Sequence, residues 1–186
     1  VHRSQIEAVM GKLAQRLSAL NIGSPLDERT EFGPVTNRQH QLKLGEFFAK
    51  ARAENNTIIH GGNLIDRPGC HVEPTVILAN TVNDTLLNEE TFGPIATFFP
   101  YDSEEELLEL MNNTPYGLSA SLWTNDLSKA LRMVPAINAG TVWVNMHTLL
   151  DPAVPFGGNK SSGVGREFGS AFIEDYTELK SVMIRY

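Results

Sequence analysis

The densest group of residue types that could do chemistry lies between Pro155 and Gly169, in the stretch PFGGNKSSGVGREFG. Glycines beside a Lys-Ser pair suggest a phosphate-binding loop, in which backbone N–H groups cradle phosphate oxygens. That motif needs a glycine directly before the lysine and another five positions earlier, but Asn159 and Val154 stand there. The last three glycines are spaced one residue too widely for the dinucleotide-binding fingerprint. The sequence therefore predicts no phosphate cradle here, and the glycines must serve another purpose.

Cys70 is the only thiol in the chain, and His71 follows it directly. Neighbouring residues of an extended segment point to opposite faces, so His71 is badly placed to act as the base of Cys70. A cysteine hydrolase built on Cys70 remains an alternative, although an unreactive cysteine is the plainer interpretation. No metal-binding spacing joins the histidines, and we expect no metal site; they are His2, His40, His60, His71 and His147.

Two adjacent carboxylates, Glu89 and Glu90, precede a turn at Gly93-Pro94. Adjacent acidic residues are most often solvated and need no function. This pair, however, lies just before a predicted strand, and loops that flank the strands of an open α/β sheet are where ligands bind. A carboxylate there can accept hydrogen bonds from a ribose diol, and Phe92 offers a flat apolar face to a ring.

The elements that must position these residues follow from hydrophobic periodicity. Helical spacing begins at a predicted capping box of Ser4 and Glu7, and a second capping box, Ser103 with Glu106, opens a later helix. We expect helices over 4–20, 37–54, 103–113 and 126–138, and strands at TIIH, HVEPTVIL, IATFF, LSASLWT and GTVWVN. Pro135 should end or kink the last helix near Val134. Alternating strands and helices predict an α/β fold with right-handed crossovers and a parallel sheet.

Composition limits the classes of partner. The chain has 186 residues, a net charge of -7 and a pI of about 5.2. An acidic surface repels nucleic acid and anionic lipid, so we expect neither nucleic acid nor a membrane as partner. No apolar run is long enough for a membrane helix, no segment has the features of a signal peptide, and a single cysteine fits a reducing compartment such as the cytoplasm.

The order and spacing of several blocks are similar to those of the NAD(P)-dependent aldehyde dehydrogenase superfamily. The blocks are NEETFGPI, NNTPYGLSASLWTNDLSKA, INAGTVWVN and PFGGNKSSGVGREFG, and the similarity extends from GSPLDERTEFGPV to YTELKSVMIRY. Through GTVWVNMHTLLD the sequence most resembles bacterial enzymes of the phenylacetaldehyde type.

The resemblance implies oxidation of a small aldehyde to a carboxylic acid with NAD or NADP, through a cysteine thioester. In the family the nucleophile lies in a GQ-x-C motif, which is absent here, and Cys70 does not match its position. We therefore assign no catalytic residue in this chain. We expect it to be the C-terminal part of such an enzyme and to be inactive by itself.

Some site residues carry over by position. Glu90 matches the family glutamate that bonds the nicotinamide ribose, and Phe92 matches the phenylalanine packed beside that ribose. Phe156 matches a phenylalanine of the substrate tunnel, while Leu149 and Leu150 fall in the loop that shapes the aldehyde entrance. The glycines around Phe156 would then let backbone pass close beside the tunnel.

The predicted organisation is a truncated catalytic domain over 1–176 and a terminal strand over 177–186. Val182, Ile184 and Tyr186 alternate with polar or flexible residues, as in a sheet-edge strand. Family members form homo-oligomers, so the resemblance implies assembly through this strand. The alternative to a catalytic role is a non-enzymatic assembly module.

Overall fold

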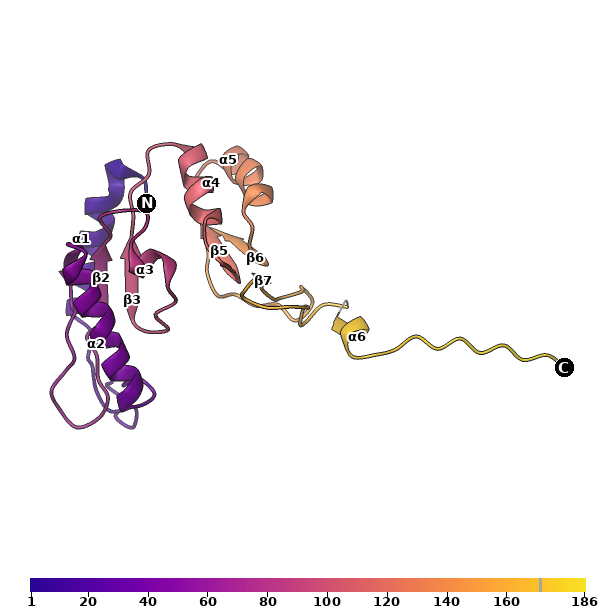
Figure 1. Cartoon of the computed structure of the whole chain (residues 1–186), viewed down its shortest axis with the longest axis horizontal. Helices are drawn as coiled ribbons and strands as arrows, with labels where there is room; N and C mark the ends of the chain where they lie inside the picture. Colours follow the sequence, from indigo (N-terminus) through magenta and orange to yellow (C-terminus); the bar gives the residue numbers. More distant parts are fainter. Residues whose placement is uncertain (171) are drawn as a thin grey trace. The chain divides into compact units, whose positions relative to one another are not determined.

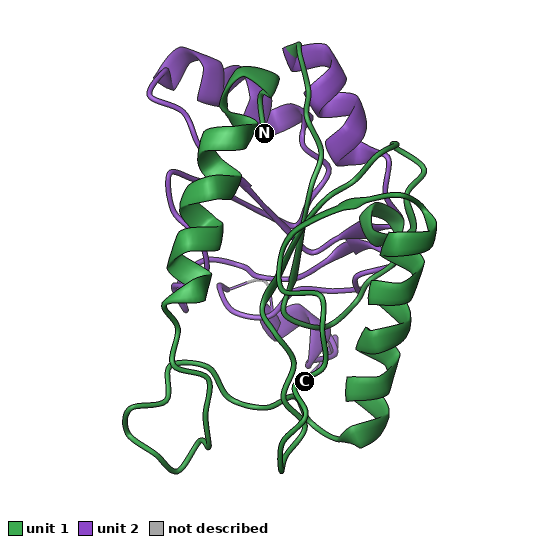
Figure 2. Ribbon diagram, turned by 90° about the vertical axis from the view of Figure 1, so that its left-hand side faces the viewer, with its two compact units in different colours: residues 1–103 green, residues 104–186 purple. Residues whose placement is uncertain are grey.

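The computed structural model describes residues 1–170 and 172–186. The chain forms two compact units, Val1–Ser103 (unit 1) and Glu104–Tyr186 (unit 2), which are coloured separately in Figure 2. Each unit has hydrophobic clusters of its own. The predicted boundaries at 1–176 and 177–186 remain a prediction.

Unit 1 places two long helices on opposite faces of a small sheet (Figure 2). Its elements are the 3-10 turn η1 Arg3–Gln5, α1 Ile6–Ser18, α2 Arg38–Ala53, β1 Thr57–His60, β2 Thr75–Leu78, α3 Thr85–Asn88 and β3 Ile95–Phe98. Alternate residues of a strand face opposite sides of the sheet. Val76 accordingly packs with Ile6 and Met10 of α1, whereas Ile77 packs with Leu44 and Phe48 of α2. Both faces of β2 are therefore buried.

Unit 2 contains the βαβ motif expected from the sequence. Its elements are α4 Glu104–Asn112, β4 Tyr116–Gly117, β5 Ser119–Leu122, α5 Leu127–Met133, the 3-10 turn η2 Val134–Ala136, β6 Thr141–Val144, β7 Asn159–Lys160 and α6 Phe172–Asp175. Strands β5 and β6 pair in parallel, with α5 between them in sequence. Leu122, Ala130 and Met133 form the core of this unit, and α4 adds Leu107 and Leu108 to it. The end of α5 at Met133, just before Pro135, confirms the predicted break.

The expectation of one parallel sheet is wrong in detail. In unit 1, β2 pairs in parallel with β3 but antiparallel with β1, which makes a mixed sheet. In unit 2, β4 and β7 form an antiparallel pair apart from β5 and β6. TIIH and HVEPTVIL lie close in sequence with no helix between them, so no crossover is available to make them parallel.

The capping box predicted for Ser4 and Glu7 is also wrong. The chain already turns at Arg3 as a 3-10 turn, so Ser4 lies within that turn. The ring of His2 accepts the Ser4 N–H instead, at 3.2 Å, and Gln5 at the start of α1 makes no side-chain cap.

The last segment, 177–186, forms no strand among the described residues. It runs away from the rest of unit 2 as an extended chain in Figure 1, and all of its side chains are exposed. A single chain offers no partner edge, so the predicted pairing with another subunit stays a prediction.

Over the described ranges, no helix has both the length and the apolar character needed to cross a bilayer. No group of three or more potential metal-ligating side chains was found in the same ranges.

Candidate functional site

The segment that carries Glu90 and Phe92 follows the short helix α3 in unit 1. Asp84 caps α3 by accepting the Leu86 N–H at 2.9 Å, and Leu86 is buried in the cluster formed by α2. Glu89 leaves the helix with extended backbone, at φ -105° and ψ 139°. A buried leucine and a capped start thus fix where this segment leaves the core.

Glu90 is exposed and makes no hydrogen bond or ion pair within the described part of the chain. Its neighbour Glu89 differs, because it lies 3.6 Å from the ammonium of Lys50 on α2. Of the adjacent acidic side chains, Glu90 is therefore the one whose acceptor oxygens remain available to a ligand.

Phe92 is the most unusual residue of the segment. The residue is 80% exposed, and its backbone lies in the left-handed region at φ 52°. Neither feature is explained by packing, because an exposed aromatic side chain buries little apolar surface and a positive φ is strained for any residue except glycine. Such strain is typical of functional positions.

Gly93 lies directly against helix α2. A Cβ at this position would come within 2.4 Å of Cδ2 of Leu44, a side chain completely buried on α2. The next residue, Pro94, accepts the Thr75 N–H at 2.8 Å and so joins the start of β3 to β2. Glu90 and Phe92 are thus placed on a turn anchored at both ends.

A shallow apolar groove of about 290 Å³ begins at Gly93 and Pro94. Leu13 and Leu17 of α1 and the ring of Phe32 form much of the rest of its lining. Neither Glu90 nor Phe92 lines this groove, so the structure places the two residues beside it rather than inside it.

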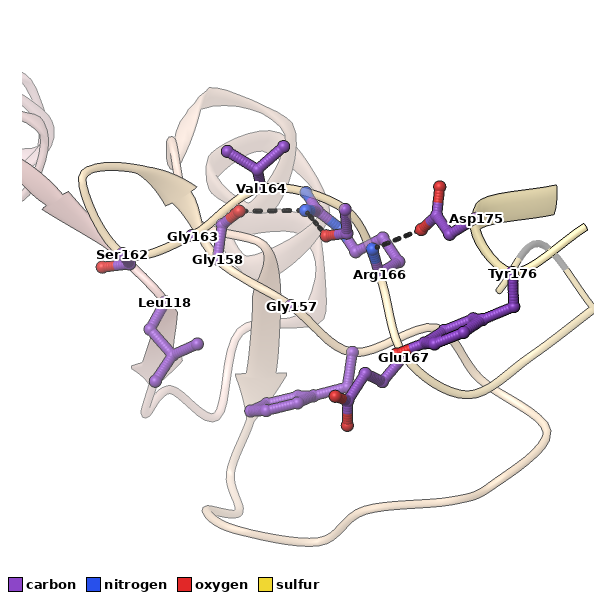
Figure 3. A pocket seen from close by; sticks show the side chains of 12 residues that line it. Leu118, Gly157, Gly158, Ser162, Gly163, Val164, Arg166, Glu167, Asp175 and Tyr176 are labelled. Atoms are coloured by element: carbon purple, nitrogen blue, oxygen red, sulfur yellow. Dashed lines mark hydrogen bonds between the residues drawn. The ribbon is translucent and has the colours of Figure 1, made fainter. Parts of the chain in front are cut away.

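A larger cavity of about 620 Å³ lies in unit 2 (Figure 3). Phe156 is one of the residues that line it. Phe156 is half-buried and is fixed through its backbone, which exchanges hydrogen bonds of 2.7 and 2.8 Å with Glu167. Leu118, Val164 and Tyr176 supply further apolar side chains to the wall, and several glycines line it as well. Leu149 and Leu150 do not line this cavity; they lie exposed on a neighbouring loop, where the Trp143 ring N–H donates to the Leu149 carbonyl at 2.9 Å.

The glycines of this region allow backbone segments to approach closely. A Cβ on Gly140 would lie 1.7 Å from the carbonyl oxygen of Gly157, and one on Gly158 would lie 2.6 Å from the backbone of Ser162. These contacts leave no room for a side chain. They agree with the expectation that the glycines permit close backbone packing, beside a cavity that Phe156 also lines.

Charged residues at the same cavity were missed by the sequence analysis. The guanidinium of Arg166 donates to the carbonyls of Gly158 and Gly165 at 2.9 and 2.8 Å, and its backbone N–H donates to Asp175 at 3.3 Å (Figure 3). Glu167 also lines the cavity. In the sequence these residues appear only as an Arg-Glu pair between glycines, a pattern that does not by itself predict a binding site.

The alternative site at Cys70 gains no support. The His71 ring is buried, and its Nδ1 lies 3.2 Å from the guanidinium of Arg67. Burial and the charge of Arg67 both lower the pKa of His71. The ring is therefore engaged with Arg67 rather than with the thiol.

Comparison with known proteins places this geometry in context. Residues 1–182 match the model of the Aldehyde dehydrogenase family. A betaine aldehyde dehydrogenase of Cereibacter sphaeroides (strain ATCC 17025 / ATH 2.4.3) is 42% identical over 96% of the chain and 37% of its own length. The 2-hydroxymuconic semialdehyde dehydrogenase of Pseudomonas sp. (strain CF600) is 38% identical over 100% of the chain and 39% of its own length.

Solved structures of aldehyde dehydrogenases are also similar to this chain. The NAD+ complex of an aldehyde dehydrogenase from Bacillus cereus superposes with a TM-score of 0.95 at 37% identity, covering 98% of this chain and 37% of that one. The chain thus spans little more than a third of the length of the relatives it matches.

Proposed function

Because the chain belongs to the aldehyde dehydrogenase family, we propose that it supplies the ribose-binding turn and part of the substrate wall of an enzyme that oxidises aldehydes to carboxylic acids with NAD or NADP. The observation that carries this proposal is the pairing of Glu90, exposed and without a partner among the described residues, with Phe92, exposed and strained. Neither contributes to the core, and both face solvent from an anchored turn.

The proposed chemistry of the turn is binding and orientation. The carboxylate of Glu90 accepts hydrogen bonds from the hydroxyls of the nicotinamide ribose, and the ring of Phe92 packs against the sugar. Holding the nicotinamide in one orientation brings its ring into the geometry that hydride transfer requires. The cofactor itself, when bound, accepts the hydride.

Phe156, Leu149 and Leu150 are proposed as the substrate-facing residues. Phe156 supplies an aromatic wall to the cavity in unit 2. Leu149 and Leu150, exposed on a neighbouring loop and outside the lining of the cavity, are proposed to shape the aldehyde entrance of the whole enzyme. The particular aldehyde is left open by these residues, and the resemblance to enzymes of the phenylacetaldehyde type stays a prediction. Homo-oligomerisation and a cytoplasmic location are further parts of the proposal, supported by the alternation in 177–186 and by the single cysteine.

We propose that the chain on its own oxidises no aldehyde. Its one thiol, Cys70, lacks a base because His71 is engaged with Arg67. No observation favours an assembly module over this catalytic context. Reduction of NAD by the purified 186-residue chain in the presence of an aldehyde would contradict the proposed inactivity.

Cofactor binding is tested by saturation-transfer NMR with millimolar NAD and, separately, NADP. We expect transfer to the ribose protons in the unmodified chain. Glu90→Gln and Phe92→Ala should each weaken binding by roughly tenfold, the loss typical of one charged hydrogen bond or one ring contact. Glu28→Gln is the matched charge control, because Glu28 is an exposed glutamate of the same unit that lies outside the turn and its support. Equal weakening of NAD binding in all three variants would show that Glu90 does not bind the cofactor.

A further inference from the structure

The loop 145–150, which carries both leucines of the proposed entrance, follows β6 and is held on the two-stranded sheet of unit 2. Ser121 on β5 and Trp143 on β6 are register partners, so their side chains share one face of that sheet. The opposite face carries Leu122 and Val144, which pack in the core of unit 2. The face with Ser121 and Trp143 is therefore turned away from this core, and the loop can be held there without entering it.

His147, in the middle of the loop, folds back onto this face. Its Nδ1 lies 2.6 Å from the hydroxyl oxygen of Ser121 on β5. Its ring also meets the indole of Trp143 edge-on, with ring centres 5.1 Å apart and planes at 79°. A histidine nitrogen accepts from a hydroxyl or donates to it according to the tautomer, so the contact with Ser121 is a hydrogen bond in either case. His147 thus touches both strands of the sheet.

Trp143 adds a second tie between the sheet and the loop. Its ring N–H donates to the Leu149 carbonyl at 2.9 Å. The indole that packs against the ring of His147 therefore also holds the backbone two residues further along. The two ties share Trp143, so releasing His147 is expected to loosen the bond to Leu149 as well.

The backbone that these ties hold is strained. Asn145 has φ 55° and Thr148 has φ 59°. Asparagine tolerates the left-handed region, and the side chain of Asn145 is fixed by hydrogen bonds of 2.9 and 2.8 Å with the backbone of Thr124. A β-branched threonine at positive φ is a genuine outlier, and such a conformation persists only where the surroundings impose it. The ties that impose it on Thr148 lie on either side, at His147 and at Leu149.

We propose that Ser121, His147 and Trp143 form a latch that holds the loop 145–150 in its strained conformation and so fixes the direction in which Leu149 and Leu150 face a substrate. The three are positioning residues, because they act on the substrate through the leucines. The link to substrate rests on the proposed function of Leu149 and Leu150. The latch itself lies wholly within unit 2 and can be tested without that function.

The first experiment reads the latch by hydrogen exchange of the Trp143 indole N–H in the full chain, observed by NMR. Exchange requires the bond to Leu149 to open, so its rate reports how often the loop is released. The other tryptophan, Trp123, is 66% exposed and makes no hydrogen bond within the described part of the chain. Its indole N–H is therefore an internal reference that the latch does not affect.

A double-mutant cycle separates a latch from incidental contacts. Ser121→Ala removes the hydroxyl, and His147→Phe keeps a ring against Trp143 but removes the nitrogen. Each should quicken exchange of the Trp143 indole roughly three- to tenfold, the range for one neutral hydrogen bond. The double variant should exchange no faster than either single variant, because both remove the same bond. Ser119→Ala, an exposed position on the same face of β5, is the matched control and should change nothing.

Two further readouts distinguish positioning from a general loss of structure. Ser121→Thr retains the hydroxyl and should keep the slow exchange of the unmodified chain. The Cα and Cβ chemical shifts of Thr148 depend on its backbone conformation and should move in Ser121→Ala and in His147→Phe, as the strained residue leaves the left-handed region.

The second experiment tests the link to substrate with 2-phenylethanol, an uncharged alcohol with the carbon skeleton of phenylacetaldehyde. Titration at millimolar concentration should perturb the methyl signals of Leu149 and Leu150 in the unmodified chain. Ser121→Ala and His147→Phe should each weaken this binding about threefold or more, because only chains with the loop held present both leucines correctly. Ser119→Ala should leave the binding unchanged.

Each outcome decides a distinct point. Additive effects of Ser121→Ala and His147→Phe on exchange, or exchange as slow as in the unmodified chain, overturn the latch. A coupled effect on exchange with unchanged binding of 2-phenylethanol overturns the positioning of the leucines by the latch. A coupled effect without any perturbation of the leucine methyls in the unmodified chain supports the latch and overturns the substrate role proposed for Leu149 and Leu150.

Discussion

At the scale of single residues, Phe92 is the clearest case of a residue whose conformation does not favour the stability of the fold. A residue selected for stability would be either buried or free of backbone strain. Phe92 is neither, because the residue is 80% exposed and its φ is 52°. The structure therefore carries a local cost at this position. The ligand-binding role proposed for Phe92 is consistent with that cost, because the same conformation turns the ring outward.

This cost can be measured. Phe92→Gly should raise the free energy of unfolding by about 1 kcal/mol, because release from a positive φ, worth about 1–3 kcal/mol, exceeds the unfolded-state entropy that glycine adds, about 0.5–1 kcal/mol, and little apolar burial is lost. Thr91→Gly, at a neighbour outside the positive-φ residues, should lower it by about 0.5–1 kcal/mol through added unfolded-state entropy. Urea denaturation of the chain gives both values. A loss of stability in Phe92→Gly would mean that the ring is held by packing.

At the scale of elements, α2 is the support on which the candidate cofactor site is built. Its buried residues Leu44 and Phe48 hold the sheet of unit 1, and Leu44 also packs against Gly93. Its exposed C-terminal side holds α3 through Lys50 and Glu54. Loosening α2 is therefore expected to disturb the turn even though no residue of α2 belongs to it.

The N-terminal cap of α2 provides a test at this scale. The side chain of Asn37 accepts the His40 N–H at 2.9 Å. Asn37→Ala should lower the free energy of unfolding by about 1 kcal/mol, whereas Asn37→Asp should leave it unchanged or raise it slightly, since aspartate caps equally well and favours the helix dipole. Thermal unfolding followed by circular dichroism distinguishes the two. Equal effects of both variants would show that the cap contributes nothing.

At the scale of the whole molecule, the exposed end of the chain is the feature that most needs a partner. Leu179, Val182, Met183, Ile184 and Tyr186 are all largely exposed, and they contribute nothing to the core of unit 2. An extended apolar segment of this kind is suited to pairing with another sheet edge. We therefore expect it to matter for assembly rather than for folding.

Light scattering tests assembly through this segment. Removal of 177–186 should reduce the molar mass to that of one chain without changing the unfolding temperature. In an edge strand, side chains two apart share a face. Charges at Val182 and Ile184 (Val182→Lys with Ile184→Lys) should therefore prevent assembly, while Ser181→Lys on the other face should not. A persistent oligomer after truncation would assign assembly to another surface.

Much of the fold could be predicted because its signals are local. Asn37 marks the start of α2, Pro135 marks the end of α5, and the alternation of β5, α5 and β6 indicates a parallel pair. The pairing of the strands was harder to predict from the sequence. That β2 pairs antiparallel with β1 but in parallel with β3 depends on contacts made across the sheet, and the direction of pairing leaves little trace within a short strand.

The sequence by itself determined the four longer helices, the family resemblance and the choice of Glu90 and Phe92, because helical periodicity and residue order are properties of contiguous segments. The short helices α3 and α6 were not predicted. Only the tertiary structure decided that Glu90 has no partner among the described residues while Glu89 has Lys50, that Gly140 meets Gly157, and that His147 lies beside Ser121. The physical reason is the same in each case. A side chain's burial and charge environment come from residues distant in the chain, which local patterns of hydrophobicity do not specify.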